Sequence, residues 1–175
     1  VVSGLGMTSQ RTRARMIERL RVDGIRNERV LAAIAAVPRH VFVEEALASR
    51  AYEDSALPLG FSQTISQPFI VARMIEILIA GGRELGKTLE VGAGSGYQAA
   101  VLAQLTKEVY AVERIEPLLA RAKINLRNIQ EFRVRLKYAD DQLGLPEAAP
   151  FDTIIVAAAA SAVPQGLLQQ LALGG

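Results

Sequence analysis

Apolar residues in the first half of the chain recur every three or four positions, which is the spacing of one face of an α-helix. Three segments show this spacing: 8–24, 27–38 and 67–82. Asn27 is a suitable N-cap for the second helix, Pro38 ends it, and Pro68 suits the first turn of the third. A short helical segment is expected within 43–51. The turn-forming residues of 52–66 predict an ordered loop that could contain a short hairpin.

The pattern changes near residue 87, where short apolar runs begin to alternate with helical segments. Strands are predicted at 87–92, 108–113, 132–140 and 151–159. Helices are predicted at 97–106, 116–128 and 164–171. Strands that alternate with helices form a parallel sheet with right-handed crossovers. We therefore expect one α/β domain, in which a helical N-terminal segment (7–82) precedes a doubly wound, Rossmann-like core (83–175).

Composition and charge narrow the functional classes. Half of the 175 residues are hydrophobic, which is enough for a buried core, and the net charge is only +2. Arg11, Arg15 and Arg19 fall on one face of the first helix, where a solvated face is favoured over a nucleic-acid contact. The most apolar stretch, "FIVARMIEILIAGG", carries Arg73 and Glu76 and is too short to span a membrane. We therefore expect neither a nucleic-acid nor a membrane partner.

The sequence contains no cysteine. Disulfides, thiolate metal sites and a cysteine nucleophile are therefore excluded within these residues. This composition is compatible with a cytoplasmic protein, and no metal site is expected.

The stretch "TLEVGAGSGYQAAVLAQL" places three glycines between the first predicted strand and a helix. Glycine permits positive φ and close approach of a ligand, and ligands of such sheets bind beyond the carboxyl ends of the strands. Gly92, Gly94 and Gly96 do not match a dinucleotide fingerprint, which needs glycine where Tyr97 stands. No Gly-Lys-Ser/Thr follows them, as a P-loop requires. Ser95 also lacks the flanking glycines of a hydrolase nucleophile.

Acidic residues follow two neighbouring strands at the same edge of the predicted sheet. Glu113 ends the second strand, where a carboxylate can accept hydrogen bonds from both ribose hydroxyls. Asp140 follows the third strand and could accept from an adenine amino group. Together with the glycines, these acids describe an adenosine site without a phosphate clamp, which fits S-adenosylmethionine better than a nicotinamide cofactor. The expected cofactor-binding residues are Glu90, Gly92, Ala93, Gly94, Ser95, Gly96, Glu113, Arg114, Asp140 and Asp141.

Motifs and residue types that the sequence lacks argue against some classes of methyl acceptor. The segment after the fourth strand, "IIVAAAASAVP", lacks the Asn/Asp-Pro-Pro-aromatic turn that is common in methylation of base amino groups. Methylation of cytosine C5 would need a cysteine. His40, the one histidine, is expected to have a structural role rather than to act as a base. Without an obvious strong base, the acceptor should already be a nucleophile at neutral pH, and a carboxylate meets this requirement.

From about Met7 to Gly175 the sequence closely resembles the protein-L-isoaspartate O-methyltransferase family. The resemblance lies in "VPRHVFV", "AYEDSALPLG", "QTISQP", "LEVGAGSGYQAAVLA", "VERIEPLL", "GLPEAAPFDTIIV" and "LLQQLALGG", of which "QTISQP" is far more specific than the glycine loop. It implies that S-adenosylmethionine methylates the α-carboxyl group of L-isoaspartyl residues in damaged proteins. The ester then collapses to a succinimide, which initiates repair. We expect a cytoplasmic, monomeric enzyme whose partners are isoaspartyl-containing proteins and peptides.

The resemblance also implies an acceptor site beside the cofactor. Ser66, in "TIS", would be the active-site serine whose hydroxyl orients the acceptor carboxylate. The same serine is also a good N-cap for a helix that starts at Gln67. Thr64 and Ile65 would line the pocket. Three small residues would keep it narrow: Ala158, Ala159 and Ala160.

The chain departs from the family pattern at two places. The family often has Gly-Asp-Gly where this chain has "ADD" at 139–141, and Ala157 replaces a common threonine after the fourth strand. The family's sheet has seven strands in the order 3-2-1-4-5-7-6, and the sequence is expected to hold the first four. The fourth strand would then be an exposed edge through which chains could associate.

Two other functions stay open at this point. One is a methyltransferase that acts on RNA or a small molecule and uses the basic face of the first helix. The other is an adenosine-binding module without turnover. Competing acceptors in a transfer assay would identify the first, and binding without turnover would identify the second.

Overall fold

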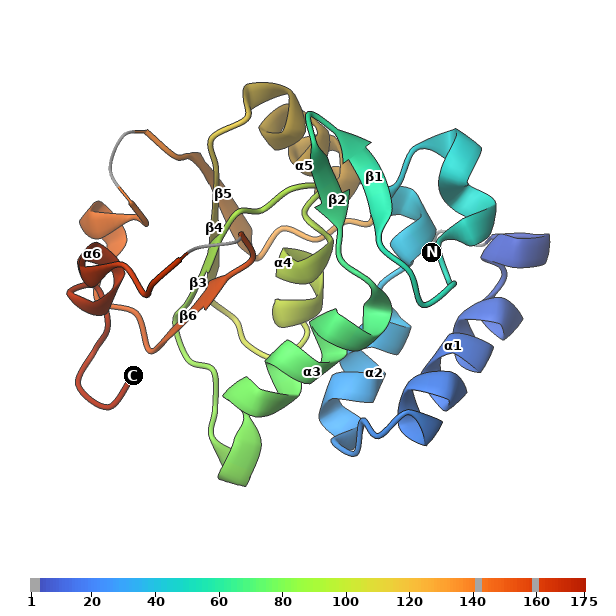
Figure 1. Ribbon diagram of the computed structural model, residues 1–175, viewed down its shortest axis with the longest axis horizontal. Helices are drawn as coiled ribbons and strands as arrows, with labels where there is room; N and C mark the ends of the chain where they lie inside the picture. Colours follow the sequence, from blue (N-terminus) through green and yellow to red (C-terminus); the bar gives the residue numbers. More distant parts are fainter. Residues whose placement is uncertain (1–3, 141–142, 159–160) are drawn as a thin grey trace.

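The computed structural model describes residues 4–140, 143–158 and 161–175. Its centre is a parallel sheet made up of β3 (Thr88–Val91), β4 (Val109–Glu113), β5 (Val134–Tyr138) and β6 (Thr153–Val156). The strand order is β5-β4-β3-β6 (Figure 1), so the chain builds outward from β3 on one side and then returns to the other. This order confirms the predicted doubly wound α/β core and puts the reversal of strand order between β3 and β6.

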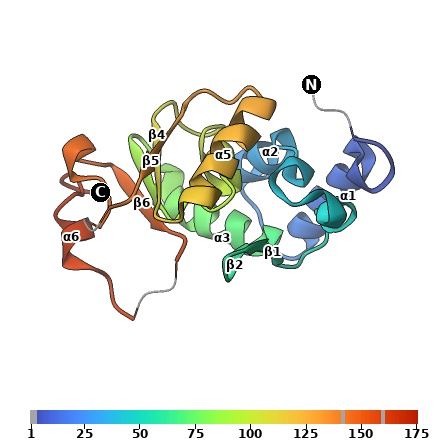
Figure 2. The same cartoon turned by 90° about the horizontal axis from the view of Figure 1, so that it is seen from above.

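The two faces of the sheet are covered by different parts of the chain. One face packs against α4 (Tyr97–Leu102) and α5 (Glu116–Asn128), in an apolar core that continues into the N-terminal helices. The other face carries a smaller cluster of Leu89, Val112, Leu145 and Phe151. The short helix α6 (Gln165–Leu168) lies on that second side, as the view from above shows (Figure 2).

The N-terminal segment contains three α-helices: α1 (Gln10–Val22), α2 (Glu28–Ala36) and α3 (Pro68–Leu78). Asn27 caps α2 as predicted, because its Oδ1 accepts the N–H groups of Arg29 and Val30. Short 3₁₀ turns lie at η1 (Gly6–Thr8), η2 (Arg39–Phe42), η3 (Glu45–Arg50), η4 (Ala80–Gly82) and η5 (Pro146–Ala148). No helix in the described residues is both long and apolar enough to cross a membrane.

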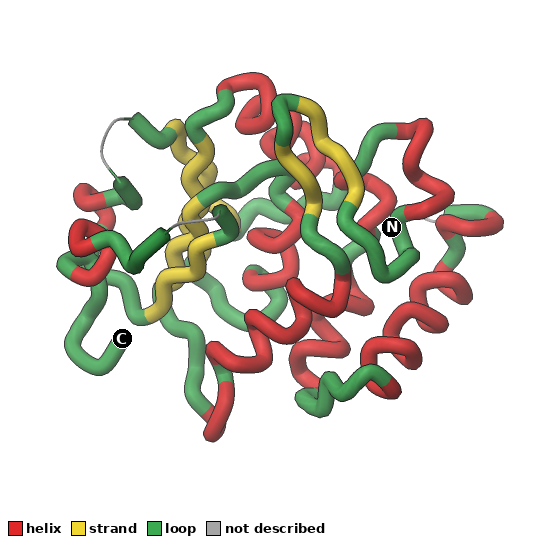
Figure 3. Tube along the Cα trace, viewed as in Figure 1, coloured by secondary structure: helices red, strands yellow, loops and turns green. Residues whose placement is uncertain are grey.

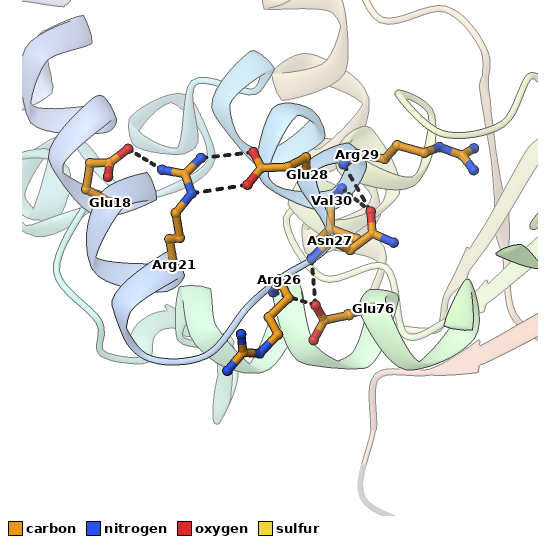
Figure 4. A network of polar contacts seen from close by, with 8 residues as sticks. All are labelled: Glu18, Arg21, Arg26, Asn27, Glu28, Arg29, Val30 and Glu76. Carbon is orange, nitrogen blue, oxygen red and sulfur yellow. Dashed lines mark hydrogen bonds and ion pairs between the residues drawn. The ribbon is translucent and has the colours of Figure 1, made fainter. Parts of the chain in front are cut away.

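A polar network fastens the turn between α1 and α2 to α3 (Figure 4). Glu76 Oε1, on α3, accepts the N–H groups of Arg26 at 2.7 Å and Asn27 at 2.8 Å. Arg21 spans the same turn, with 2.9 Å between its Nη2 and Glu28 Oε2. These contacts tie the three helices together.

The loop that precedes α3 contains the hairpin that the sequence allowed for. Its strands are β1 (Leu57–Gly60) and β2 (Gln63–Ile65), the upper pair of yellow segments in Figure 3. Phe61 and Ser62 form the turn with φ values of 54° and 56°. Positive φ at both positions is the geometry of a type I′ turn, which suits the twist of a two-residue hairpin. Ser66 follows directly after this hairpin.

Candidate active site

The carboxyl ends of the four parallel strands open into a cleft of about 970 Å³. This volume lies within the range of small-molecule sites, about 300–1,000 Å³. The hairpin residues Ser62 and Gln63 also line the cleft, opposite the strand ends. Eight of the residues expected from the sequence line it: Thr64, Ser66, Gly92, Gly94, Glu113, Arg114, Asp140 and Ala158. The cleft therefore lies where ligands of doubly wound sheets bind.

The glycine loop holds its shape through its backbone and through packing on α5. Gly94 has φ +55° and lines the cleft, and a Cβ at this position would come within 3.4 Å of Leu59 Cδ1. Gly96 has φ +88° and does not line the cleft. A Cβ on Gly96 would come within 3.3 Å of Ala122 Cβ on α5. Gly96 thus allows the loop to approach α5, where Asn125 Nδ2 donates to the Ser95 carbonyl at 3.0 Å.

Glu113 is buried and connects the glycine loop to the β4–α5 turn. Its Oε2 accepts the N–H of Gly94 at 2.8 Å, and its Oε1 accepts the N–H of Ile115 at 2.9 Å. Each carboxylate oxygen has a second lone pair. The carboxylate lines the cleft and can therefore accept further hydrogen bonds from a ligand diol.

A smaller pocket of about 40 Å³ lies next to the cleft and shares Ser66, Gly92 and Gly94 with it. Glu90 lines this pocket; only 1% of its surface is exposed, and its Oε2 has no hydrogen-bond partner within the described part of the chain. Burial, followed by repulsion from Glu113, holds the pKa of Glu90 well above its usual range. A buried carboxyl oxygen that has no partner among the described residues fits a ligand with a positive charge, because such a charge would favour the ionised form of Glu90.

Several expected residues line the small pocket and not the cleft, and Gly96 lines neither. Ile65, Ala93 and Ser95 line the small pocket together with Glu90. Asp140 lines the cleft just beyond the carboxyl end of β5. Asp141, Ala159 and Ala160 lie outside the described residues.

Ser66 lies at the border between the cleft and the small pocket and is half-buried. The interpretation of Ser66 as a helix cap is wrong, because α3 begins at Pro68 and its N-cap position is Gln67. Asp54 supplies the missing acceptor from across the loop, with its Oδ1 2.9 Å from the N of Phe69. The Ser66 hydroxyl is consequently not used by the helix.

The fold brings to the site several side chains that were not predicted from the sequence. Tyr97 and Gln98 are buried and line the small pocket, and the Tyr97 hydroxyl and Gln98 Nε2 have no partner among the described residues. Arg39 is completely buried, and its Nη2 donates a hydrogen bond to the Ser66 carbonyl. The one signal for Arg39 in the sequence is a charge inside the apolar run "VPRHVFV".

His40 lies outside both spaces, in agreement with the structural role expected for it. Its Nδ1 is 2.9 Å from the Tyr52 hydroxyl. Partial burial, with a smaller contribution from Arg13, lowers the pKa of His40. The imidazole is therefore held neutral within the fold rather than directed at the cleft.

Comparison with known proteins identifies the family. The family model described as protein-L-isoaspartate(D-aspartate) O-methyltransferase (PCMT) matches residues 11–175. The chain belongs to this family. A protein-L-isoaspartate O-methyltransferase of Dechloromonas aromatica (strain RCB) is 77% identical over 175 residues, which are 100% of this chain and 81% of that protein. One of Aromatoleum aromaticum is 67% identical over 170 residues, or 97% of this chain and 78% of that protein.

Solved structures agree with the fold of a PCMT family member. A protein-L-isoaspartate O-methyltransferase superimposes with a TM-score of 0.82 at 29% identity, covering 93% of this chain. The chain spans about half of that longer structure, 53% of its length. A putative PCMT from Plasmodium falciparum, solved with S-adenosyl-L-homocysteine, has a TM-score of 0.78 at 23% identity, covering 91% of this chain and 79% of that one. The second likeness concerns the fold alone.

Proposed function

We propose that this chain transfers a methyl group from S-adenosylmethionine to the α-carboxyl group of L-isoaspartyl residues in damaged proteins. The observation that carries the proposal is the meeting of Glu113 and Ser66 around one cleft, with Glu90 in the small pocket beside it, in a PCMT family member. The high identity to relatives named for this activity supports it.

The described residues fit the cofactor that this reaction requires. Glu113 can accept hydrogen bonds from the ribose hydroxyls, and Asp140 lies where an adenine amino group would be expected. Glu90, whose Oε2 has no partner among the described residues, suits a cationic methyl donor. When bound, S-adenosylmethionine supplies a methyl group on a positively charged sulfur. The complex of the Plasmodium relative with S-adenosyl-L-homocysteine concerns that protein and is compatible with this assignment.

The acceptor chemistry agrees with the side chains around Ser66. An ionised carboxylate is already a nucleophile, so no general base has to remove a proton, and His40 lies outside the cleft. The charges of acceptor and donor neutralise each other during transfer, which favours a site that excludes water. The Ser66 hydroxyl would align the acceptor carboxylate. The names of the relatives imply isoaspartyl-containing proteins as substrates, whereas a cytoplasmic location and a monomeric state remain predictions.

The test is transfer of a labelled methyl group to a peptide that contains L-isoaspartate. We expect labelling of this peptide and none of the matched peptide with ordinary aspartate. Structured RNA in the same reaction should neither accept label nor compete with the peptide. Labelling of RNA, or equal labelling of both peptides, would contradict the proposal. Cofactor binding without any transfer would support an adenosine-binding module instead.

A further inference from the structure

Arg39 lies at the start of η2 (Arg39–Phe42), and its side chain is completely buried. No carboxylate among the described residues forms an ion pair with it. A buried charge without a counter-ion is unfavourable unless its donors are well used. The surrounding contacts should therefore explain why an arginine occupies this position.

The guanidinium of Arg39 holds the loop around the candidate acceptor site. Its Nε donates to the Ala51 carbonyl at 2.8 Å, and its Nη2 donates to the Ser66 carbonyl at 2.8 Å. A longer contact of 3.5 Å joins Nη2 to the Ser55 carbonyl. One side chain thus fixes both ends of the segment that contains the hairpin.

The same guanidinium packs on the helix that follows the glycine loop. Its central carbon lies 4.9 Å from the centroid of the Tyr97 ring, a cation–π distance. Tyr97 is the first residue of α4 and comes directly after Gly96. Arg39 therefore contacts both the loop that contains Ser66 and the start of α4.

Asp54 completes the support from the other side of the loop. Its Oδ1 accepts the N–H of Phe69 at 2.9 Å, and its Oδ2 lies 3.3 Å from Gln67 Nε2. The residues after Ser66 are thus held by Asp54, while the Ser66 carbonyl is held by Arg39. The Ser66 hydroxyl itself has no hydrogen bond within the described chain, so its position depends on this backbone support.

We propose that Arg39 is a positioning residue, which sets the place of the Ser66 hydroxyl relative to the glycine loop by binding the Ser66 carbonyl and stacking on Tyr97. The inference rests on the proposed function, because it assumes that Ser66 aligns the acceptor. Lysine cannot replace Arg39, since it lacks the planar fork that reaches two carbonyls and stacks on a ring. A displacement of about 1 Å at such a site can lower the rate by about a hundredfold.

The first measurement does not depend on activity. Hydrogen–deuterium exchange of residues 64–67 should become faster in Arg39→Lys. Arg13→Lys is the matched control, because Arg13 Nη1 donates to the Ala35 carbonyl at 3.0 Å and its guanidinium lies 5.9 Å from the Tyr52 ring. The control should leave exchange at 64–67 unchanged. Unchanged exchange in Arg39→Lys would overturn the inference.

The second measurement separates positioning from mere stability. At a temperature where the variant is folded, Arg39→Lys should lower kcat on the isoaspartyl peptide by about tenfold or more, while the cofactor Kd stays within about twofold. In the Ser66→Ala background, Arg39→Lys should lower kcat little further, because both changes remove the same alignment of the acceptor carboxylate. An equal loss of kcat in both backgrounds would overturn the inference, as would a normal kcat in Arg39→Lys.

The proposal stays testable if the lysine variant does not fold or if the protein is inactive on the peptide. If Arg39→Lys does not fold, Tyr97→Leu removes the stacking partner and should show the same faster exchange of residues 64–67 to a smaller extent. Its absence in a folded Tyr97→Leu protein would count against the role of Arg39. If the unchanged protein fails to methylate the isoaspartyl peptide, the proposed function is wrong, and the exchange measurement still decides whether Arg39 holds the Ser66 loop.

Discussion

Glu113 performs a structural task before any ligand is considered. Its carboxylate accepts one backbone N–H from the glycine loop and one from the turn that leads into α5. A change at this residue therefore acts on the cofactor site in two ways, through the lost ligand contact and through a loosened loop. The two effects can be separated, because only the second changes the stability of the protein without ligand.

We expect Glu113→Ala to weaken cofactor binding at least tenfold in calorimetry. The reason is the loss of charge-assisted hydrogen bonds, each worth about 1.5–3 kcal/mol. Glu116→Ala is the control, because it removes the same charge from an exposed site in the first turn of α5. Unchanged affinity in the Glu113 variant would exclude this carboxylate from the cofactor site.

Ser66→Ala should lower turnover of the isoaspartyl peptide more than it lowers cofactor affinity. Because Asp54, and not Ser66, binds the first turn of α3, the melting temperature should change by little. A lost N-cap would instead cost about 1 kcal/mol. Thermal melts and steady-state kinetics on the same sample test both statements. Normal turnover would remove the serine from the acceptor site.

The buried Glu90 should make stability depend on pH. Burial and Glu113 raise its pKa from 4.5, so the folded state binds the proton more tightly than the unfolded state does. The resulting stabilisation is complete below about pH 4.5 and is lost as the pH rises through the folded pKa. Glu90→Gln removes the ionisation, so we expect the variant to gain stability over the unchanged protein as the pH rises from 4.5 to 7.5.

Thermal melts without cofactor measure this difference. A gain of about 1 kcal/mol would raise the melting temperature by about 2–4 °C in a chain of this size. Glu147→Gln, at an exposed position in η5, should show no such trend. A constant difference between Glu90→Gln and the unchanged protein across this range would mean that folding does not raise the pKa of Glu90.

At the scale of elements, Asp54 is the contact that joins the hairpin loop to α3. Asp54→Ala should lower the free energy of unfolding by about 1 kcal/mol, because the Phe69 N–H at the start of α3 loses its acceptor. Glu53→Ala is the control, since Glu53 makes only an exposed ion pair with Arg50. Denaturant unfolding compares the two. Equal effects would show that α3 does not depend on this cap.

Local sequence patterns predict most of the helices and strands. They fail where contacts between residues far apart in the sequence determine the structure. The predicted helix 116–128 coincides with α5, and all four predicted strands form. Helix 164–171 shortens to α6, because the backbone of residues 170–172 instead pairs with Phe151, whose N–H donates to the Gln170 carbonyl and whose carbonyl accepts the Ala172 N–H. The cap of α3 by Asp54 and the burial of Arg39 likewise depend on residues far away in the sequence, and no local pattern predicts them.

The topology of the parallel sheet made the site residues at the strand ends predictable. Parallel strands bring their carboxyl ends to one edge, so Glu113 and Asp140 had to lie near the glycine loop. The resemblance to a known family supplied Ser66, which periodicity alone does not distinguish from a cap. Tyr138 and the hairpin residues Ser62 and Gln63 line the cleft without any motif of their own.

At the scale of the whole molecule, one apolar core joins the helical segment to the sheet. It contains Leu20 and Ile34 from the N-terminal helices together with Ala111 and Ile155 from the sheet. We expect a single unfolding transition in calorimetry, with equal calorimetric and van't Hoff enthalpies. Two separate transitions would mean that 7–82 and 83–175 unfold as independent units, against the prediction of one domain.

This shared core also bears on how such an enzyme can change during evolution. A helical segment taken from another methyltransferase would bring side chains that do not fit the apolar surface of α4 and the sheet, and packed cores tolerate such mismatches poorly. The turn of the hairpin has no such restriction, because Phe61 is 54% exposed. We therefore expect new acceptor preferences to arise by substitution at the tip of the hairpin rather than by exchange of the helical segment.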